Sequence, residues 1–178
     1  KKDDLPSITN LLAQLGKTPF FKDKKPTPYD EAVSIIWYLE NVLYYSISKI
    51  YSYVQQHVYD GDILDNEIID LGFWPGGDRD GNPFVTTDIT LKVAERLRQT
   101  ILRNYHKDVR KVKRRLTFKG IEEILTRVEK RLNKHVTKSY KVVNFSQEIL
   151  LSELHKARKI LVENHDSLFL EDLDDLIH

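Results

Sequence analysis

Apolar residues recur at intervals of three and four along most of this chain, the spacing that places side chains on one face of an α-helix. The longest such stretch, residues 29–59, predicts one helix whose buried face carries Ile35, Ile36, Leu39, Val42, Leu43, Ile47, Ile50, Tyr51 and Val54. Pro26 and Pro28 mark its start, and Asp30 and Glu31 add negative charge where a helix N-terminus favours it. A helix of about 28 residues would be roughly 40 Å long.

A second long helix is predicted over residues 88–116, with Thr86 or Thr87 as its N-cap. Its apolar positions follow the same spacing and are Ile89, Val93, Leu97, Ile101, Tyr105, Val109, Val112 and Leu116. Shorter helices are predicted over residues 6–15, 120–136 and 145–164, the last opening with the capping sequence Asn144-Phe145-Ser146-Gln147, and over residues 169–178. The pattern therefore predicts an all-α fold, a long-helix bundle that forms a single domain over residues 1–178.

The amino-acid composition limits the partners and the compartment that we expect for this protein. The 28 Lys and Arg residues and 27 Asp and Glu residues nearly cancel, so there is no general attraction to nucleic acid or to an anionic membrane. No apolar run is long enough for a membrane span. The absence of cysteine suits a reducing compartment, so we expect a cytoplasmic protein, and the absence of methionine suggests a fragment or a processed chain.

Basic residues are concentrated in residues 96–115, on the second long helix. Such a concentration can form an anion- or nucleic-acid-binding face, but stacking aromatic residues are not interleaved along it as a single-strand binder would need. A solvated face, or pairing with acidic residues near the end of the chain, is the favoured interpretation. Those acidic residues are Glu171, Asp172, Asp174 and Asp175.

Residues 72–86, between the two long helices, form the most unusual segment. A simple connection needs about two to eight residues, and this one is longer. Its glycines permit backbone conformations closed to other residues, and Asp78 and Asp80 bracket Arg79, which could be held between them or offered to an anion. Trp74 adds a large apolar surface, so a functional loop is favoured over a purely structural turn. A calcium loop of the EF-hand type is disfavoured, because Ile89 occupies the position of its last glutamate.

The string FWPGGDRDGNPFVT, residues 73–86, resembles a signature stretch of the phosphoenolpyruvate carboxylases. KPTPYDEA, residues 25–32, is similar to the family's lead into a long helix, and TTDIT, residues 86–90, is similar to the start of the next one. The resemblance covers about residues 25–116. One departure lies inside the signature, where Pro75 replaces methionine or another apolar residue.

This resemblance implies a larger (β/α) barrel enzyme, of which the chain would be an all-helical insertion. Such enzymes are carbon-carbon lyases that join bicarbonate to phosphoenolpyruvate with Mg²⁺ or Mn²⁺, giving oxaloacetate and phosphate. The family's loop tryptophan, here Trp74, is associated with the apolar wall that retains carbon dioxide, and Arg79 is the best candidate for touching an anion. The loop scaffold would comprise Gly76, Gly77, Asp78, Asp80, Gly81, Asn82 and Pro83.

The family's Thr-Ala-His-Pro-Thr segment, with its catalytic histidine, is missing from the sequence, as are its metal-binding carboxylates and phosphate-binding arginine loops. The chain alone is therefore expected to be inactive and to bind no metal or other cofactor. Its expected partner is the remainder of the same polypeptide, in a parent that forms a homo-oligomer. The alternative is a helical module without an enzyme parent, which would bind a protein or an anion through its loop and basic helix.

Overall fold

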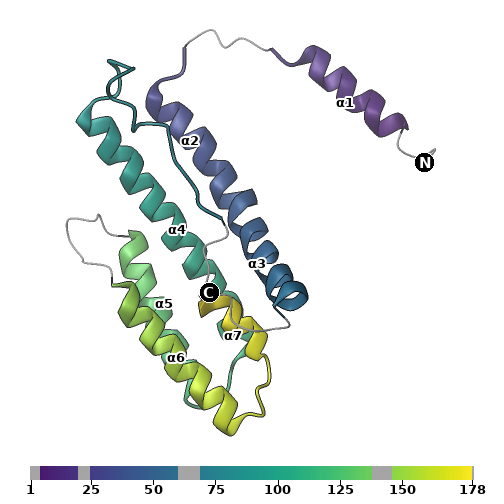
Figure 1. Ribbon diagram of the computed structural model, residues 1–178, viewed down its shortest axis with the longest axis vertical. Helices are drawn as coiled ribbons and strands as arrows, with labels where there is room; N and C mark the ends of the chain where they lie inside the picture. The colour runs from purple at the N-terminus through teal and green to yellow at the C-terminus, as the bar shows by residue number, and fades with distance from the viewer. Residues whose placement is uncertain (1–4, 20–24, 60–68, 138–145, 178) are drawn as a thin grey trace.

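The computed structural model describes residues 5–19, 25–59, 69–137 and 146–177, and all regular secondary structure in these residues is helical (Figure 1). The all-α fold class is therefore confirmed. The elements are α1 (Leu5–Lys17), α2 (Pro28–Tyr38), the π-helical turn η1 (Leu39–Leu43), α3 (Tyr44–Val58), α4 (Thr87–Arg115), α5 (Ile121–Thr137), α6 (Gln147–Asn164) and α7 (Leu170–Ile177).

Short polar side chains fix the starts of three helices. Thr27 and Asp30 form a reciprocal capping box at α2, in which the Thr27 hydroxyl accepts from the Asp30 amide at 3.2 Å and the Asp30 carboxylate accepts from the Thr27 amide at 3.0 Å. Thr86, one of the two predicted caps, accepts from the Ile89 amide of α4. At α6 the capping residue is Ser146, while Asn144 lies outside the described residues.

The predicted helix over residues 29–59 is a continuous rod made of α2, η1 and α3, with a π-helical turn in its middle. Its predicted buried face is wrong at four positions, since the side chains of Ile35, Val42, Leu43 and Ile50 are 45%, 44%, 36% and 46% exposed. The reason is geometric. Among the described elements, only α4 packs extensively against the rod, mainly against α2 and η1, so the rod's other sides stay partly exposed.

Helix α4 is the central element, because it packs against the rod on one side and against α5 and α7 on another (Figure 1). The rod contacts α4 as far along as Asp108, α5 contacts it from Arg98 onward, and α7 contacts its second part. The hydrophobic core lies around this second part. It comprises Leu102, Val109, Val112, Leu116, Ile121, Ile124, Leu125, Val128, Leu132, Leu150, Leu154, Ala157, Leu161 and Leu173. Two predicted apolar positions of α4, Ile101 and Tyr105, are 36% and 39% exposed, since α4 turns different faces to its different neighbours.

Part of the basic stretch on α4 pairs with acidic residues, as expected. The Arg115 guanidinium lies 2.6 Å from the Asp172 carboxylate of α7. On the α5 side, the Glu129 carboxylate receives Lys113 Nζ at 2.8 Å and Arg110 Nε at 3.5 Å. These ion pairs join α4 to both of its C-terminal neighbours.

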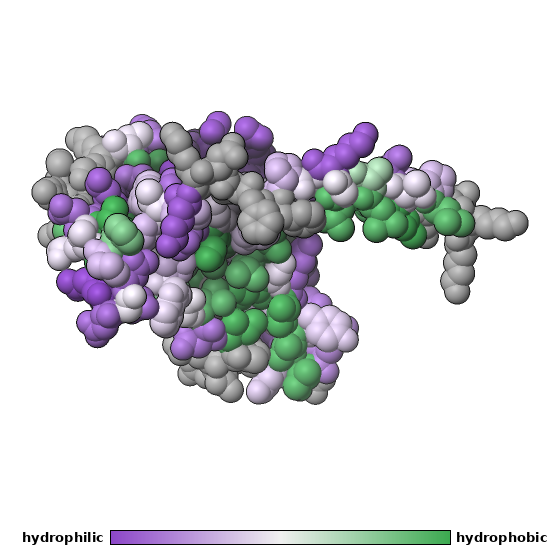
Figure 2. Space-filling view, turned by 90° about the horizontal axis from the view of Figure 1, so that it is seen from above, coloured by the Kyte–Doolittle hydropathy of each residue, from purple (hydrophilic) through white to green (hydrophobic). Residues whose placement is uncertain are grey.

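Helix α1 lies apart from the bundle and contains no buried residue. Its apolar side chains form one stripe, visible along one side of the projecting helix in Figure 2. The stripe comprises Leu5, Ile8, Leu11, Leu12 and Leu15, each between 51% and 64% exposed. Among the described helices, none is both long and apolar enough to cross a membrane.

Candidate functional site

The candidate loop, residues 72–86, belongs to a segment that leaves the α3 side of the molecule and returns to the start of α4 (Figure 1). Its approach is tethered to the rod, because the Ile69 amide donates to the Tyr51 hydroxyl at 3.4 Å. Its far end is the Thr86 cap of α4. The C-terminal end of the loop is therefore fixed to α4, and the segment before the loop is bonded to α3.

The first turn of the loop spans Trp74 to Gly77, whose amide donates to the Trp74 carbonyl at 3.0 Å. Pro75 and Gly76 occupy its centre, and Gly76 has a φ of +78°. Proline followed by a glycine of positive φ is the combination that a type II turn requires. Pro75, the departure from the family string, therefore fits the backbone at this turn.

Gly76 also touches α4 directly. A Cβ at this position would lie 2.7 Å from Val93 Cγ2, and the Thr90 hydroxyl donates to the Gly76 carbonyl at 2.8 Å. The positive φ and the close approach exclude any larger residue without movement. This contact holds the loop against the first turns of α4.

The second half of the loop is held by two side chains that bond nearby backbone amides. Asp78 Oδ1 accepts from the Gly81 amide at 3.2 Å, and Asn82 Oδ1 accepts from the Phe84 amide at 3.0 Å. The Val85 amide closes the turn on the Asn82 carbonyl, and the Val85 side chain is buried. Short polar side chains of this kind replace the backbone partners that a loop lacks.

Among the described residues, Arg79 forms no ion pair with Asp78 or Asp80, so the carboxylate fork that the sequence allows is not formed. Its Nη1 donates to the Thr87 hydroxyl at 3.4 Å, a long hydrogen bond. Arg79 and Asp80 are both exposed, which leaves the guanidinium available to an anion.

Two aromatic rings project from the loop. Trp74 is 74% exposed and Phe84 is 68% exposed, although the backbone beside each is fixed by hydrogen bonds. An exposed apolar side chain on a loop with a fixed backbone is a candidate for contact with another protein segment. The loop thus carries three exposed side chains, Trp74, Arg79 and Phe84, before the N-terminal end of α4.

The sequence profile described as phosphoenolpyruvate carboxylase matches residues 2–167. The chain belongs to the phosphoenolpyruvate carboxylase family. The match includes the loop, the rod and all of α4, so the similarity to the family extends beyond residues 25–116 to most of the chain.

Individual relatives give the same result. A phosphoenolpyruvate carboxylase of Shewanella halifaxensis is 35% identical over 129 residues, which cover 70% of this chain and 15% of that protein. Those of Shewanella loihica and Rhodothermus marinus are 37% and 28% identical over 113 and 114 residues, covering 61% and 62% of this chain. The chain spans only 12–15% of the length of these relatives. No solved structure matches the chain significantly.

The resemblance to a carboxylase implies a divalent metal, and the side chains in the described part of the chain do not fit one. In residues 5–19, 25–59, 69–137 and 146–177, no group of three or more His, Asp or Glu side chains is placed to hold a metal ion. Asp78 bonds a backbone amide, and Asp80 is exposed on the loop surface. No step of the chemistry is therefore assigned to a metal on this chain.

Sequence reasoning missed Asn104, a residue of α4 that is only 1% exposed. Its side-chain amide donates to the Glu40 carbonyl of the π-helical turn at 3.1 Å. The available signal was a polar residue four positions after Thr100, inside a helix whose other inward positions are mostly apolar. That spacing puts both polar side chains on the face that meets the rod.

Proposed function

We propose that this chain is one part of a phosphoenolpyruvate carboxylase that joins bicarbonate to phosphoenolpyruvate, giving oxaloacetate and phosphate. The observation that carries the proposal is the family match over residues 2–167, together with a signature loop that is anchored to α4 and presents Trp74 outward. Because the chain spans a small part of its relatives, we propose that it is inactive alone and that the remainder of the same polypeptide supplies the catalytic groups.

The proposed role of Trp74 follows from the chemistry of carbon dioxide capture. In this reaction the phosphate of phosphoenolpyruvate passes to bicarbonate, and the resulting carboxyphosphate releases carbon dioxide and phosphate beside the enolate. Carbon dioxide is retained only if the surrounding wall is apolar and excludes water. An indole that is 74% exposed on an anchored loop could supply part of such a wall.

The proposed role of Arg79 is to contact an anion. Its guanidinium is exposed and free of both neighbouring carboxylates, so its positive charge is not neutralised locally. Guanidinium groups bind carboxylates and phosphates through paired hydrogen bonds, and both groups occur in the substrate. The divalent metal of the reaction, Mg²⁺ or Mn²⁺, would be held by residues outside this chain.

Packing supports the proposed partner. The stripe on α1 and the outward side of the rod leave large apolar residues uncovered, among them Trp37, Tyr38 and Tyr53 at 56–61% exposure. Exposed apolar surface of this extent usually marks a contact with other protein. The remainder of the carboxylase polypeptide, assembled in a homo-oligomer, is the cover that we propose.

The test is the substitution Trp74→Ala in a polypeptide of full carboxylase length that contains this chain. Phosphate release should continue while the yield of oxaloacetate per phosphate falls severalfold, because carbon dioxide escapes before capture. Phosphate can be measured colorimetrically and oxaloacetate by coupling to malate dehydrogenase.

Leu71→Ala is the matched control, because Leu71 is an exposed apolar residue just before the loop, and it should leave the ratio of oxaloacetate to phosphate nearly unchanged. If Trp74→Ala preserves this ratio and only lowers the melting temperature, Trp74 is a packing residue and its proposed role is wrong.

A further inference from the structure

The π-helical turn in the rod frees a backbone carbonyl. In a regular α-helix the Tyr44 amide would bond the carbonyl of Glu40, four residues earlier. Here it bonds the carbonyl of Leu39, five residues earlier. The Glu40 carbonyl is thereby released from its usual partner, and a turn of this kind holds one more residue than an α-helix over the same length.

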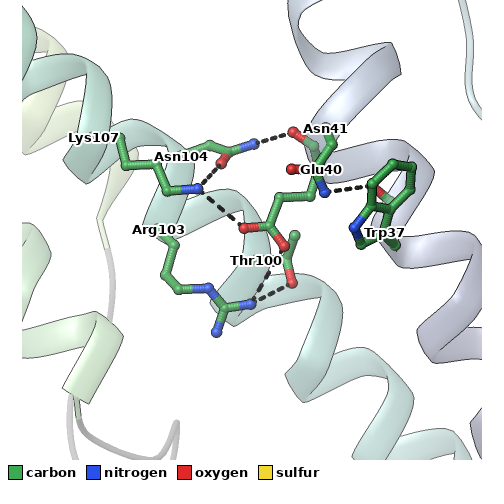
Figure 3. Close-up of polar contacts among 7 residues, drawn as sticks. All are labelled: Trp37, Glu40, Asn41, Thr100, Arg103, Asn104 and Lys107. Atoms are coloured by element: carbon green, nitrogen blue, oxygen red, sulfur yellow. Dashed lines mark hydrogen bonds and ion pairs between the residues drawn. The ribbon is translucent and has the colours of Figure 1, made fainter.

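Asn104 of α4 donates a hydrogen bond to this carbonyl (Figure 3). Its Nδ2 donates to the Glu40 carbonyl oxygen at 3.1 Å, and its Oδ1 accepts from Lys107 Nζ at 3.3 Å. Lys107 Nζ in turn lies 3.2 Å from Glu40 Oε1. An amide as buried as that of Asn104 is costly unless both its donor and its acceptor are bonded, and here both are.

The two features depend on each other. Without the π-helical turn, the Glu40 carbonyl would already be bonded within the rod when Asn104 meets it. With an apolar residue in place of Asn104, the released Glu40 carbonyl would have no hydrogen-bond donor in α4. Buried polar groups are known to select one register between helices over others. We propose that Asn104 and the Glu40 carbonyl form a register lock, which selects the π-helical turn and so determines which side of α3 faces α4.

The register of α3 also affects the contacts that lead to the candidate loop. If the turn relaxed to a regular α-helix, α3 would rotate by about 100° and move by about 1.5 Å relative to α2. Tyr44, whose hydroxyl donates to Asp108 of α4 at 2.8 Å, would leave that partner. Tyr51, which accepts from the Ile69 amide on the approach to the loop, would leave it as well.

Asn104 is therefore a positioning residue for residues 72–86. It does not touch the loop, and acts through the register of α3. Its importance for carboxylation rests on the proposed function, whereas the lock itself does not. For this reason the test uses the folding equilibrium of the 178-residue chain and not its activity.

The experiment compares three variants: Asn104→Leu, a deletion of Asn41 from the π-helical turn, and the two combined. Deleting one residue converts the turn to a regular helix and leaves α3 on its present face. Each change alone should lower the folding equilibrium constant by about 10- to 100-fold, because each leaves one buried polar group without its partner. The combined variant should recover most of this loss, as judged by urea unfolding.

Ser48 provides the control, since it is exposed in α3 beyond the turn. Deletion of Ser48 should not rescue Asn104→Leu, because it rotates the rest of α3. Hydrogen exchange of the Ile69 amide should speed up in Asn104→Leu and return to the parent rate in the combined variant.

Additive losses in the combined variant would overturn the register lock. If the combined variant recovers stability but the exchange rate of the Ile69 amide is the same in all variants, the link between the register lock and the loop is wrong. If Asn104→Leu does not fold, Asn104→Ala takes its place in the same cycle, with the same expectations.

Discussion

At the scale of single residues, Gly76 determines the shape of the loop. It combines a φ of +78° with a close approach to Val93 of α4. Gly76→Ala should lower the free energy of unfolding by about 1 to 3 kcal/mol, from backbone strain and from the displaced Val93 side chain. Urea unfolding measures the change.

Gly72 is the matched control for that substitution, because a Cβ at Gly72 would meet nothing within 4 Å. Gly72→Ala should change stability by less than about 1 kcal/mol and can be stabilising. An equal loss in both variants would show that the contact with Val93 does not hold the loop.

His135 of α5 is a buried titratable residue, only 4% exposed. Burial, with a smaller contribution from the charges of Arg98 and Arg131, lowers the pKa of His135 below its usual value. Above about pH 6.5 the ring is neutral in both the folded and the unfolded chain. As the pH falls below that value the unfolded chain takes up the proton first, so stability falls, by up to about 1.4 kcal/mol per pH unit inside the window.

This linkage predicts that the chain is less stable at pH 5.5 than at pH 7.5, and that His135→Gln loses part of that difference. Chemical unfolding at the two pH values is the measurement. His155, which is exposed on α6, gives the control substitution His155→Gln, and this variant should keep the full difference. The same pH dependence in both variants would contradict the assignment to His135.

At the scale of the elements, Glu129 is the main electrostatic connection between α5 and α4. The hydrogen bond from Lys113, together with the charges of His106 and Arg110, lowers the pKa of Glu129, although partial burial opposes this. A carboxyl whose pKa is lowered by folding stabilises the protein above its unfolded pKa of about 4.3. That contribution is lost as the pH falls through the folded value.

Glu129→Gln should therefore lower the free energy of unfolding by about 1 to 2 kcal/mol at pH 7 and by less at pH 3. Glu163 of α6 is the control, because its carboxylate is 56% exposed and lies 3.8 Å from Lys159. Glu163→Gln should change stability by less than about 0.5 kcal/mol. A loss for Glu129→Gln that does not shrink on acidification would argue against an electrostatic origin.

The positions of the helices were largely predictable from the sequence, whereas the irregular turn inside the rod was not. The start of α4 follows from Thr86 and from the apolar spacing after it, both properties of neighbouring residues. The π-helical turn at Leu39–Leu43 was not predictable, because it depends on Asn104, which is 64 positions from Glu40 in the chain. The apolar spacing within residues 29–59 cannot show that the side chain of Asn104, far away in the sequence, donates to the Glu40 carbonyl.

At the scale of the whole molecule, the bundle leaves much apolar surface open. Helix α1 buries no residue, so its stripe contributes little to the stability of the chain. The isolated chain should self-associate at high concentration and bind an apolar dye. The double substitution Leu11→Gln, Leu12→Gln should reduce both effects while leaving the melting temperature of the bundle unchanged.

The polar side of α1 gives the control for that experiment. Asn10→Ala combined with Gln14→Ala should leave self-association and dye binding as they are in the parent chain. Light scattering and dye fluorescence are the measurements, and a parent chain that stays monomeric and binds no dye would contradict the prediction.

The candidate site divides in a similar way between sequence and structure. The string in residues 73–86 was sufficient to indicate the family, since a run of specific residues is a property of the chain itself. The sequence was not sufficient to predict the partners of Arg79, because it allows either a carboxylate fork or an unpaired guanidinium. Only the fold decides, by using Asp78 to bond the Gly81 amide.

The positions of the helices, the caps at the starts of α4 and α6, and the family follow from the sequence alone, because each depends on residues that are close together along the chain. Tertiary structure alone decided which apolar residues of the rod are buried, that the rod contains a π-helical turn and how the loop sits against α4. The physical reason is the same throughout. Burial, the partner of a buried amide such as that of Asn104, and the close approach of Gly76 to Val93 are relations between segments, and they exist only once those segments are packed together.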